Sequence, residues 1–166
     1  MKTVFFIRHA KSSWADLSLD DFDRPLNNRG KRDAPFMAKR LYDLGVRPDA
    51  IISSPAKRAF TTAKHFGKAN GIDKKDILKV EAIYEAWTST VFEIIQKLPE
   101  DWQTILVFGH NPAFTTIANS FAGDTYIDNV PTCGIVQVEA TIDKWKQFNE
   151  QTGIVKAFHY PKQYFQ

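Results

Sequence analysis

The chain has little cysteine, no long apolar run and almost no excess charge, and each absence narrows its class. The single cysteine, Cys133, excludes an intrachain disulfide and is compatible with a reducing compartment. No apolar segment is long enough to cross a bilayer. Basic residues number 22 and acidic residues 19, and this small, scattered excess gives little support to nucleic-acid binding. We therefore expect a cytoplasmic protein with neither a nucleic-acid nor a membrane partner.

The bulk composition fits one globular domain. With 166 residues, the chain is long enough to bury roughly 70% of its unfolded surface. It contains no repeat, low-complexity segment or linker, so we expect a single domain over residues 1–166. The leading apolar stretch is shorter than the core of a signal peptide. The mildly positive charge suits an anionic substrate.

Runs of β-branched and aromatic residues alternate with amphipathic segments. Four strands are expected first and two alternating strands near the end, at 4–7, 50–53, 77–80, 104–108, 134–140 and 153–159. A first helix is expected after about Asn28 and up to Leu44, with Pro35 either in its first turn or at a kink. Further helices are expected from Ser54-Pro55 to about Asn70, from Ser89 to Leu98, from Asn111-Pro112 to about Phe121, and as one turn near Trp145. This order predicts an α/β three-layer sandwich, with a mostly parallel central sheet, helices on both faces and an antiparallel C-terminal edge.

Three strand-to-helix junctions carry cations or imidazoles: Arg8-His9, Arg58 and His110. Taken alone, Arg8-His9 favours an ordinary strand end. In a parallel sheet, however, the downstream ends of the strands share one edge, so these residues can converge. If Arg8 and His9 serve one site, the strand must end at about Arg8. Guanidiniums and imidazoles at helix N-termini predict an anion pocket, in which arginine forks bind phosphoryl oxygens.

The same residues belong to longer motifs. In chain order these are Arg8-His9, Arg24-Pro25-Leu26-Asn27-Asn28-Arg29-Gly30, Ser54-Pro55-Ala56-Lys57-Arg58, Ile83-Tyr84-Glu85-Ala86 and Gly109-His110. With these motifs the chain resembles the histidine phosphatase superfamily over nearly its whole length. The Arg-His-Ala-Lys-Ser and Gly-His-Asn-Pro stretches are most similar to the branch of SixA-type phosphohistidine phosphatases.

The resemblance implies a role for each matching residue. His9 would be the nucleophile and become phosphohistidine, with its other ring nitrogen held by a backbone carbonyl. Arg8, Arg58 and His110 would bind the phosphoryl oxygens and, with His9, form the phosphate-binding site. Glu85 matches the position of a general acid in many relatives, although a solvated carboxylate is an equally good interpretation. No metal and no cofactor are expected, because the cations take the charge role.

The loop from Lys11 to about Asn28 is long for a compact domain and is expected to be functional or a lid. Ser12 is a candidate donor to the phosphate, although ordinary loop capping explains it equally well. The acidic residues of this loop lack the spacing of a calcium loop and are expected to be solvated; they are Asp16, Asp20, Asp21 and Asp23. Ala10 stands where many relatives have glycine, so the turn must keep a negative φ or carry strain.

These observations predict a metal-independent phosphatase that acts through a phosphohistidine intermediate on His9. Its expected substrate is phosphohistidine in a protein, because the chain lacks the insertion with which some relatives cover their pocket. Two alternatives stay open: a phosphatase of small phosphomonoesters, and a non-catalytic phosphate-binding module. We expect the protein to be a monomer.

Overall fold

The structure is a computed structural model that describes residues 1–165. Its centre is a mixed six-stranded sheet with the strand order β3-β2-β4-β1-β5-β6. The strands are Lys2–Arg8 (β1), Ala50–Ser53 (β2), Leu78–Lys79 (β3), Thr104–Gly109 (β4), Ile135–Ala140 (β5) and Gly153–His159 (β6). The first four run parallel, whereas β5 is antiparallel to β1 and β6 to β5. The predicted antiparallel C-terminal edge is confirmed.

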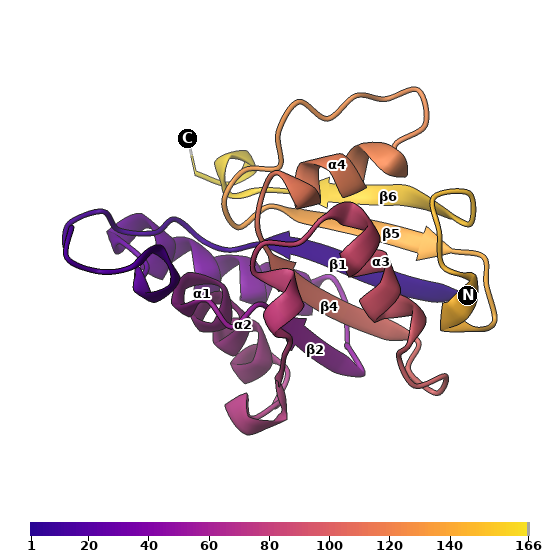
Figure 1. The fold of residues 1–166 in the computed structure, drawn as a ribbon, viewed down its shortest axis with the longest axis horizontal. Coiled ribbons are helices and arrows are strands. Elements are labelled where there is room, and N and C mark those ends of the chain that lie inside the picture. The colour runs from indigo at the N-terminus through magenta and orange to yellow at the C-terminus, as the bar shows by residue number, and fades with distance from the viewer. Residues whose placement is uncertain (166) are drawn as a thin grey trace.

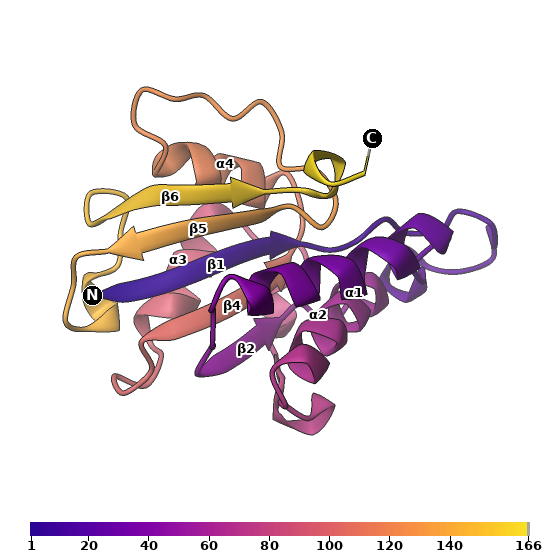
Figure 2. The same cartoon turned by 180° about the vertical axis from the view of Figure 1, so that it is seen from behind.

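Helices cover both faces of the sheet. They are Asn28–Asp43 (α1), Lys57–Ala69 (α2), Thr88–Gln96 (α3) and Ala113–Ser120 (α4). Figure 1 shows α3 and α4 in front of the sheet, and Figure 2, from behind, shows α1 and α2 on the opposite face. The predicted three-layer α/β sandwich is confirmed. Among the helices of residues 1–165, none has both the length and the hydrophobicity of a membrane span.

Strand β1 shows why the central strands read as continuous apolar runs. Val4 and Phe6 pack into the core beneath α3 and α4, whereas Phe5 and Ile7 pack into the core beneath α1 and α2. Successive side chains of a strand point to opposite faces, so a strand covered on both sides needs apolar residues at every position. Strand β4 is likewise buried on both faces, and β1 and β4 end at the same edge of the sheet.

One predicted helix start is wrong and one was left open. Helix α2 begins at Lys57 instead of at Ser54-Pro55, because the Ser54 hydroxyl is engaged with a histidine across the sheet. Helix α1 begins at Asn28, where the predicted loop ends, and Pro35 lies in its interior rather than in its first turn, which was one of the two positions left open for it. The reason is local, since the Asn27 side chain accepts a hydrogen bond from the Gly30 N–H and caps the helix earlier.

Gly30 permits a close contact between α1 and the loop that follows β1. A Cβ at this position would lie 2.2 Å from the backbone oxygen of Lys11. We expect Gly30→Ala to lower the free energy of unfolding by about 1–3 kcal/mol, because backbone must shift to relieve the overlap. Denaturant melts measure this, with the exposed Lys31→Ala on the same helix as the control. A stabilised Gly30→Ala variant, as helix propensity alone predicts, would contradict this explanation.

Candidate active site

The residues predicted to converge come from three neighbouring strand ends. Strand β1 ends at Arg8, which lies opposite Gly109 of β4, and the His9 N–H donates to the Gly109 carbonyl over 3.1 Å. His110 follows β4 directly, and the centroids of the two imidazole rings are 5.2 Å apart. Arg58 lies in the first turn of α2, after β2. The parallel sheet therefore brings these sequence-distant side chains to one place.

His9 is buried and held in one tautomer. Its Nδ1 lies 2.7 Å from the carbonyl oxygen of Ala10, an acceptor, so Nδ1 carries the proton. Nε2 is then unprotonated and has a lone pair available for attack. The pKa of His9 is lowered to about 3, mainly by burial and in smaller part by the nearby His110, Arg58 and Arg8, against the raising effect of the Ala10 carbonyl. His9 is therefore neutral at pH 7 in the unliganded protein.

Thr62 holds the turn that orients His9. Its buried hydroxyl accepts a hydrogen bond from the Ala10 N–H over 2.9 Å and donates to the Arg58 carbonyl over 2.7 Å. Within residues 1–165, the non-glycine residue with a positive φ is Cys133, so the turn at Ala10 keeps a negative φ. Sequence reasoning missed Thr62. The available signal is its position one helical turn after Arg58.

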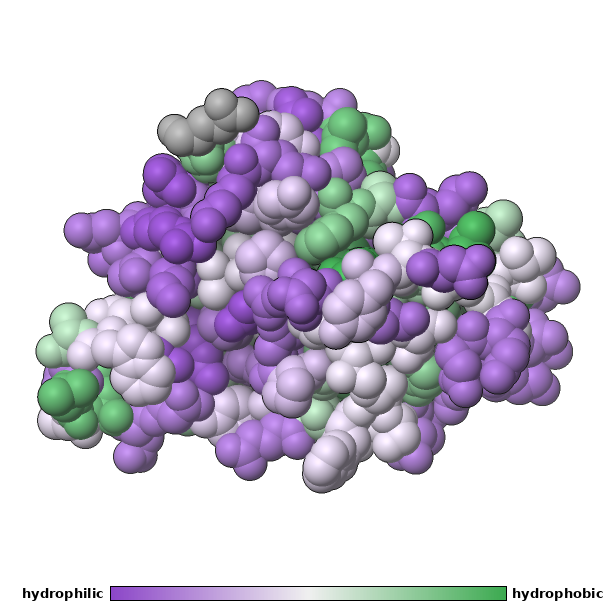
Figure 3. All heavy atoms as spheres, turned by 90° about the horizontal axis from the view of Figure 1, so that it is seen from above, coloured by the Kyte–Doolittle hydropathy of each residue, from purple (hydrophilic) through white to green (hydrophobic). Residues whose placement is uncertain are grey.

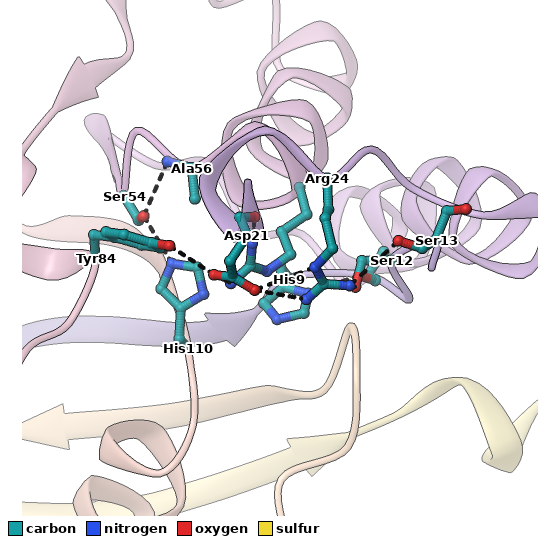
Figure 4. A network of polar contacts seen from close by, with 11 residues as sticks. His9, Ser12, Ser13, Asp21, Arg24, Ser54, Ala56, Tyr84 and His110 are labelled. Atoms are coloured by element: carbon teal, nitrogen blue, oxygen red, sulfur yellow. Dashed lines mark hydrogen bonds and ion pairs between the residues drawn. The ribbon is translucent and has the colours of Figure 1, made fainter. Parts of the chain in front are cut away.

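Ser54 orients His110 as Thr62 orients His9. The Ser54 hydroxyl oxygen accepts from the Ala56 N–H over 3.2 Å and lies 2.7 Å from His110 Nε2 (Figure 4). Within residues 1–165 the Ser54 hydroxyl hydrogen has no other acceptor, so we assign it to Nε2, which leaves the His110 proton on Nδ1. Burial lowers the pKa of His110 to about 3, and the adjacent Arg58 adds to the effect.

Three buried N–H groups around these rings have no protein acceptor within residues 1–165. They are Arg8 Nε, Arg58 Nε and His110 Nδ1. Native proteins rarely leave buried donors unpaired, so such a cluster indicates an anion as the intended acceptor. Burial and the charge of Arg58 lower the pKa of Arg8, and a bound anion would relieve that repulsion.

Asp21 was predicted to be a solvated loop residue; it is exposed, but its carboxylate also binds three side chains, which the prediction missed. Its Oδ2 accepts from Arg58 Nη2 over 2.9 Å and from the Tyr84 hydroxyl over 2.6 Å, and its Oδ1 accepts from Arg24 over 3.1 Å (Figure 4). The Tyr84 hydrogen bond is the main cause that lowers the pKa of Asp21 to about 2, and Arg58 adds to it. Burial and Asp21 together raise the pKa of Tyr84 to about 12.

The remaining predicted residues lie around this centre. Glu85 is exposed and lines the same cavity, of about 330 Å³, as Arg58 and His110. Ser12 is buried, and its hydroxyl oxygen accepts from Arg24 Nη1 over 2.7 Å, so a direct phosphate contact stays a prediction. Within residues 1–165, no group of three or more His, Cys, Asp or Glu side chains is arranged to hold a metal ion.

The rim of the site is exposed and partly apolar. Trp87, which lines the cavity, is 78% exposed. Figure 3 shows apolar side chains at its left end, where the loop from β1 to α1 projects, and Trp14 and Leu17 of that loop are exposed. The Arg24 guanidinium stacks on Trp14 at 3.6 Å from the ring centroid. The same guanidinium binds the Asp21 carboxylate, so Arg24 connects the exposed Trp14 to Asp21.

Comparisons with known proteins agree with this geometry. The family model described as "Histidine phosphatase superfamily (branch 1)" matches residues 4–123. An uncharacterized protein of Mycobacterium tuberculosis is 30% identical over 165 residues, covering 94% of this chain and 100% of that protein. Phosphoserine phosphatase 1 of Hydrogenobacter thermophilus is 30% identical over 119 residues, covering 69% of this chain and 55% of that protein.

Among solved structures, a candidate phosphohistidine phosphatase SixA from Agrobacterium tumefaciens matches with a TM-score of 0.79 and 28% identity. The match covers 96% of this chain and 98% of that one. The chain therefore belongs to the histidine phosphatase superfamily, and it is a phosphatase of that superfamily. Within the superfamily its sequence and fold are of the SixA type, as the motifs predicted.

The buried imidazoles lead to a prediction about pH. We expect His9 and His110 of the unliganded protein to stay neutral at pH 5, because burial lowers both pKa values to about 3. In the unfolded chain both titrate near 6.5, so the unfolded state binds more protons between about pH 6.5 and 3. Stability should therefore fall as the pH drops through that window. Imidazole ¹⁵N shifts measure the protonation, and a midpoint near 6.5 for either ring would contradict the prediction.

Proposed function

We propose that the protein hydrolyses phosphohistidine in a phosphorylated protein through a covalent phosphohistidine intermediate on His9. One observation carries the proposal: the His9 ring, with its free Nε2, lies 5.2 Å from the His110 ring between centroids and close enough to Arg8 and Arg58 for their charges to lower its pKa, and these three residues have buried nitrogens without a protein partner within residues 1–165. A nucleophile of fixed tautomer next to an oxyanion site is the arrangement that phosphoryl transfer needs, since positioning and charge supply most of the catalysis.

In the first step, His9 Nε2 attacks phosphorus in line with the leaving group. The new N–P bond forms while the bond from phosphorus to the substrate atom breaks, and its electron pair leaves with that atom. Arg8, Arg58 and His110 donate hydrogen bonds to the three equatorial oxygens, where charge is spread in the transition state. The Ala10 carbonyl holds the Nδ1 proton and stabilises the cationic character that the His9 ring gains.

In the second step, water attacks the phosphoenzyme and His9 is the leaving group. The P–N bond breaks, its electron pair returns to Nε2, and inorganic phosphate is released. His9 departs as a neutral imidazole because Nδ1 has kept its proton throughout. Arg8 and Arg58 supply the positive charge that this transfer needs, and neither proposed step uses a metal or a cofactor.

Two observations support a protein substrate. The cavity opens beside exposed side chains such as Trp87 and Glu85, so a phosphorylated side chain can reach it from outside. The 28% identical structure carries the name of a phosphohistidine phosphatase. The second candidate function is hydrolysis of a small phosphomonoester, which the relative named phosphoserine phosphatase 1 favours.

Substrate comparison separates the two candidates. We expect kcat/KM for a protein phosphorylated on histidine to exceed that for O-phosphoserine and for sugar phosphates by at least about 10²-fold. The assay measures phosphate release at matched pH and ionic strength, with His65→Ala as a control in a histidine outside the site. A low KM on a free phosphomonoester, with no turnover of the phosphoprotein, would favour the second candidate.

Glu85 provides a finer prediction about the leaving group. A hydroxyl leaving group departs as a costly alkoxide unless an acid protonates it, whereas a phosphohistidine ring departs neutral when its distal nitrogen is protonated. We expect Glu85→Gln to slow hydrolysis of an alkyl phosphate by about 10²-fold or more and to change phosphohistidine hydrolysis far less. Equal losses in kcat/KM on both substrates would contradict an acid role for Glu85.

A further inference from the structure

Asp21 is a carboxylate stationed at the rim of the anion site by three different side chains. Arg58 and Tyr84 bind one carboxylate oxygen, and Arg24 binds the other through two nitrogens, each at 3.1 Å. The Asp21 side chain remains 49% exposed and lines the same cavity as His110. The carboxylate is fixed by these four hydrogen bonds and still borders the cavity, so a ligand N–H that reaches it must share one of its oxygens with Tyr84 or an arginine.

The contact with Arg58 leaves that guanidinium free to bind a phosphoryl group. Arg58 donates from Nη1 to the Asp21 backbone oxygen and from Nη2 to the Asp21 carboxylate, so the end of its fork is occupied. The buried Nε–H and the second hydrogen of Nη2 form the other edge, which has no protein acceptor at Nε. Arg58 can therefore bridge Asp21 and an anion at once.

The direction of attack places the leaving group on the side of Asp21. His9 is 7% exposed and does not line the cavity, whereas the exposed Asp21, Glu85 and Trp87 do. In-line transfer requires the leaving group to depart opposite the nucleophile. The leaving group thus departs through the open part of the cavity, which Asp21 borders.

We propose that Asp21 is a specificity-determining residue whose carboxylate accepts a hydrogen bond from the distal ring N–H of an imidazole leaving group. This inference rests on the proposed function and names the part of the substrate that the site recognises. A carboxylate at this position stabilises the departure of a leaving group that carries an N–H and repels a leaving group that carries a carboxylate of its own. A charge-assisted hydrogen bond of this kind is among the stronger contacts in proteins.

The step balances without a proton transfer to Asp21. The bond from His9 Nε2 to phosphorus forms, the bond from phosphorus to the substrate ring nitrogen breaks, and its electron pair stays on that nitrogen. The distal nitrogen keeps its proton, so the ring departs as a neutral imidazole. Asp21 favours the ring form that carries this proton, which is the form able to leave.

The two rim carboxylates then have different tasks. Asp21 is anchored by cations and a hydroxyl, so it stays ionised and acts as an acceptor. Within residues 1–165, the Glu85 side chain takes part in no hydrogen bond or ion pair, so no protein partner holds it away from a leaving group in the cavity that it lines. Asp21 therefore serves leaving groups that bring a proton, and Glu85 serves those that need one.

The test crosses two variants with two small substrates in the full-length protein. N-phosphoimidazole has a leaving group with a distal N–H, whereas p-nitrophenyl phosphate has a stable phenolate that needs none. We expect Asp21→Asn to lower kcat/KM for N-phosphoimidazole at least 10-fold more than for p-nitrophenyl phosphate. The loss on p-nitrophenyl phosphate measures any displacement of Arg58, which affects both substrates.

Two further variants sharpen the result. Asp23→Asn removes the same charge two residues along the same 3₁₀ turn, where the side chain makes no hydrogen bond or ion pair within residues 1–165, and we expect equal effects on both substrates. Tyr84→Phe keeps the ring packed against Phe22 and His110 but removes one anchor of Asp21. We expect it to show the same substrate selectivity as Asp21→Asn, with a smaller loss.

Equal losses on both substrates would overturn the inference and leave Asp21 as a residue that only positions Arg58. Increased activity on both, or no change on either, would also overturn it, because the carboxylate would then obstruct the site or be idle. These outcomes differ from failure of the proposed function. That failure would show as wild-type protein that forms no phosphoenzyme on His9 from either substrate.

Discussion

We expect the His9→Ala variant to lose at least about 10⁴-fold of the wild-type kcat/KM and to form no phosphoenzyme. Removing a nucleophile eliminates the covalent route, and the remaining cations stabilise charge without a group to accept the phosphoryl. The measurement combines steady-state phosphate release with trapping of ³²P-labelled protein in alkali, where phosphohistidine survives. Wild-type protein should carry the label on His9.

The same experiment distinguishes the enzyme from a phosphate-binding module. His65→Ala is the control, since His65 lies on α2 away from the cavity and should leave both labelling and turnover intact. A module would show no label on wild type or variant and would keep its affinity for phosphate after His9→Ala. Label on His9→Ala would place the nucleophile at another residue and contradict the proposed mechanism.

The second large effect concerns Arg58, for which we expect Arg58→Lys to lower kcat/KM by about 10²–10³-fold. The Arg58 fork faces two ways in the structure, toward Asp21 with Nη1 and Nη2 and toward the cavity with its buried Nε. A lysine ammonium keeps the charge but cannot serve both directions with a planar geometry. Losing one preorganised oxyanion donor has costs of this size in other enzymes.

Arg47→Lys is the matched control, because Arg47 is exposed and binds backbone carbonyls near the end of α1. We expect its kcat/KM to stay within about twofold of the wild-type value, since surface changes away from a site have small effects. Full activity of Arg58→Lys would mean that charge alone suffices. The fork would then have no part in phosphoryl binding.

The convergence of His9 and His110 was predictable from the sequence. Each follows a buried apolar strand, and parallel strands end at one edge, so periodicity and topology together placed the two rings near each other. Arg58 was predictable for a similar reason, although its helix begins at Lys57 and not at Ser54. These positions lie at the ends of regular strands and helices, and the apolar periodicity of such elements is visible in a sequence.

The contacts that complete the site were not predictable in this way. Asp21 lies in an irregular loop, and its partners Arg58 and Tyr84 are 37 and 63 positions away in the chain. Thr62 and Ser54 act through single hydrogen bonds to groups on other strands or turns. No periodicity encodes such contacts, because they depend on where the loop and strand ends meet after folding. The local signals available were the spacing of Asp21 and Arg24 and that of Arg58 and Thr62.

The most direct test of the account is a crystal structure of the protein with orthovanadate, which mimics a transferring phosphoryl group. We expect vanadium bonded to His9 Nε2, with oxygens about 3 Å from Arg8 Nε, Arg58 Nε and His110 Nδ1, and Asp21 still bound to Arg58. Vanadate bound away from His9, or bound there with these three donors directed elsewhere, would contradict the claim that they form one oxyanion site.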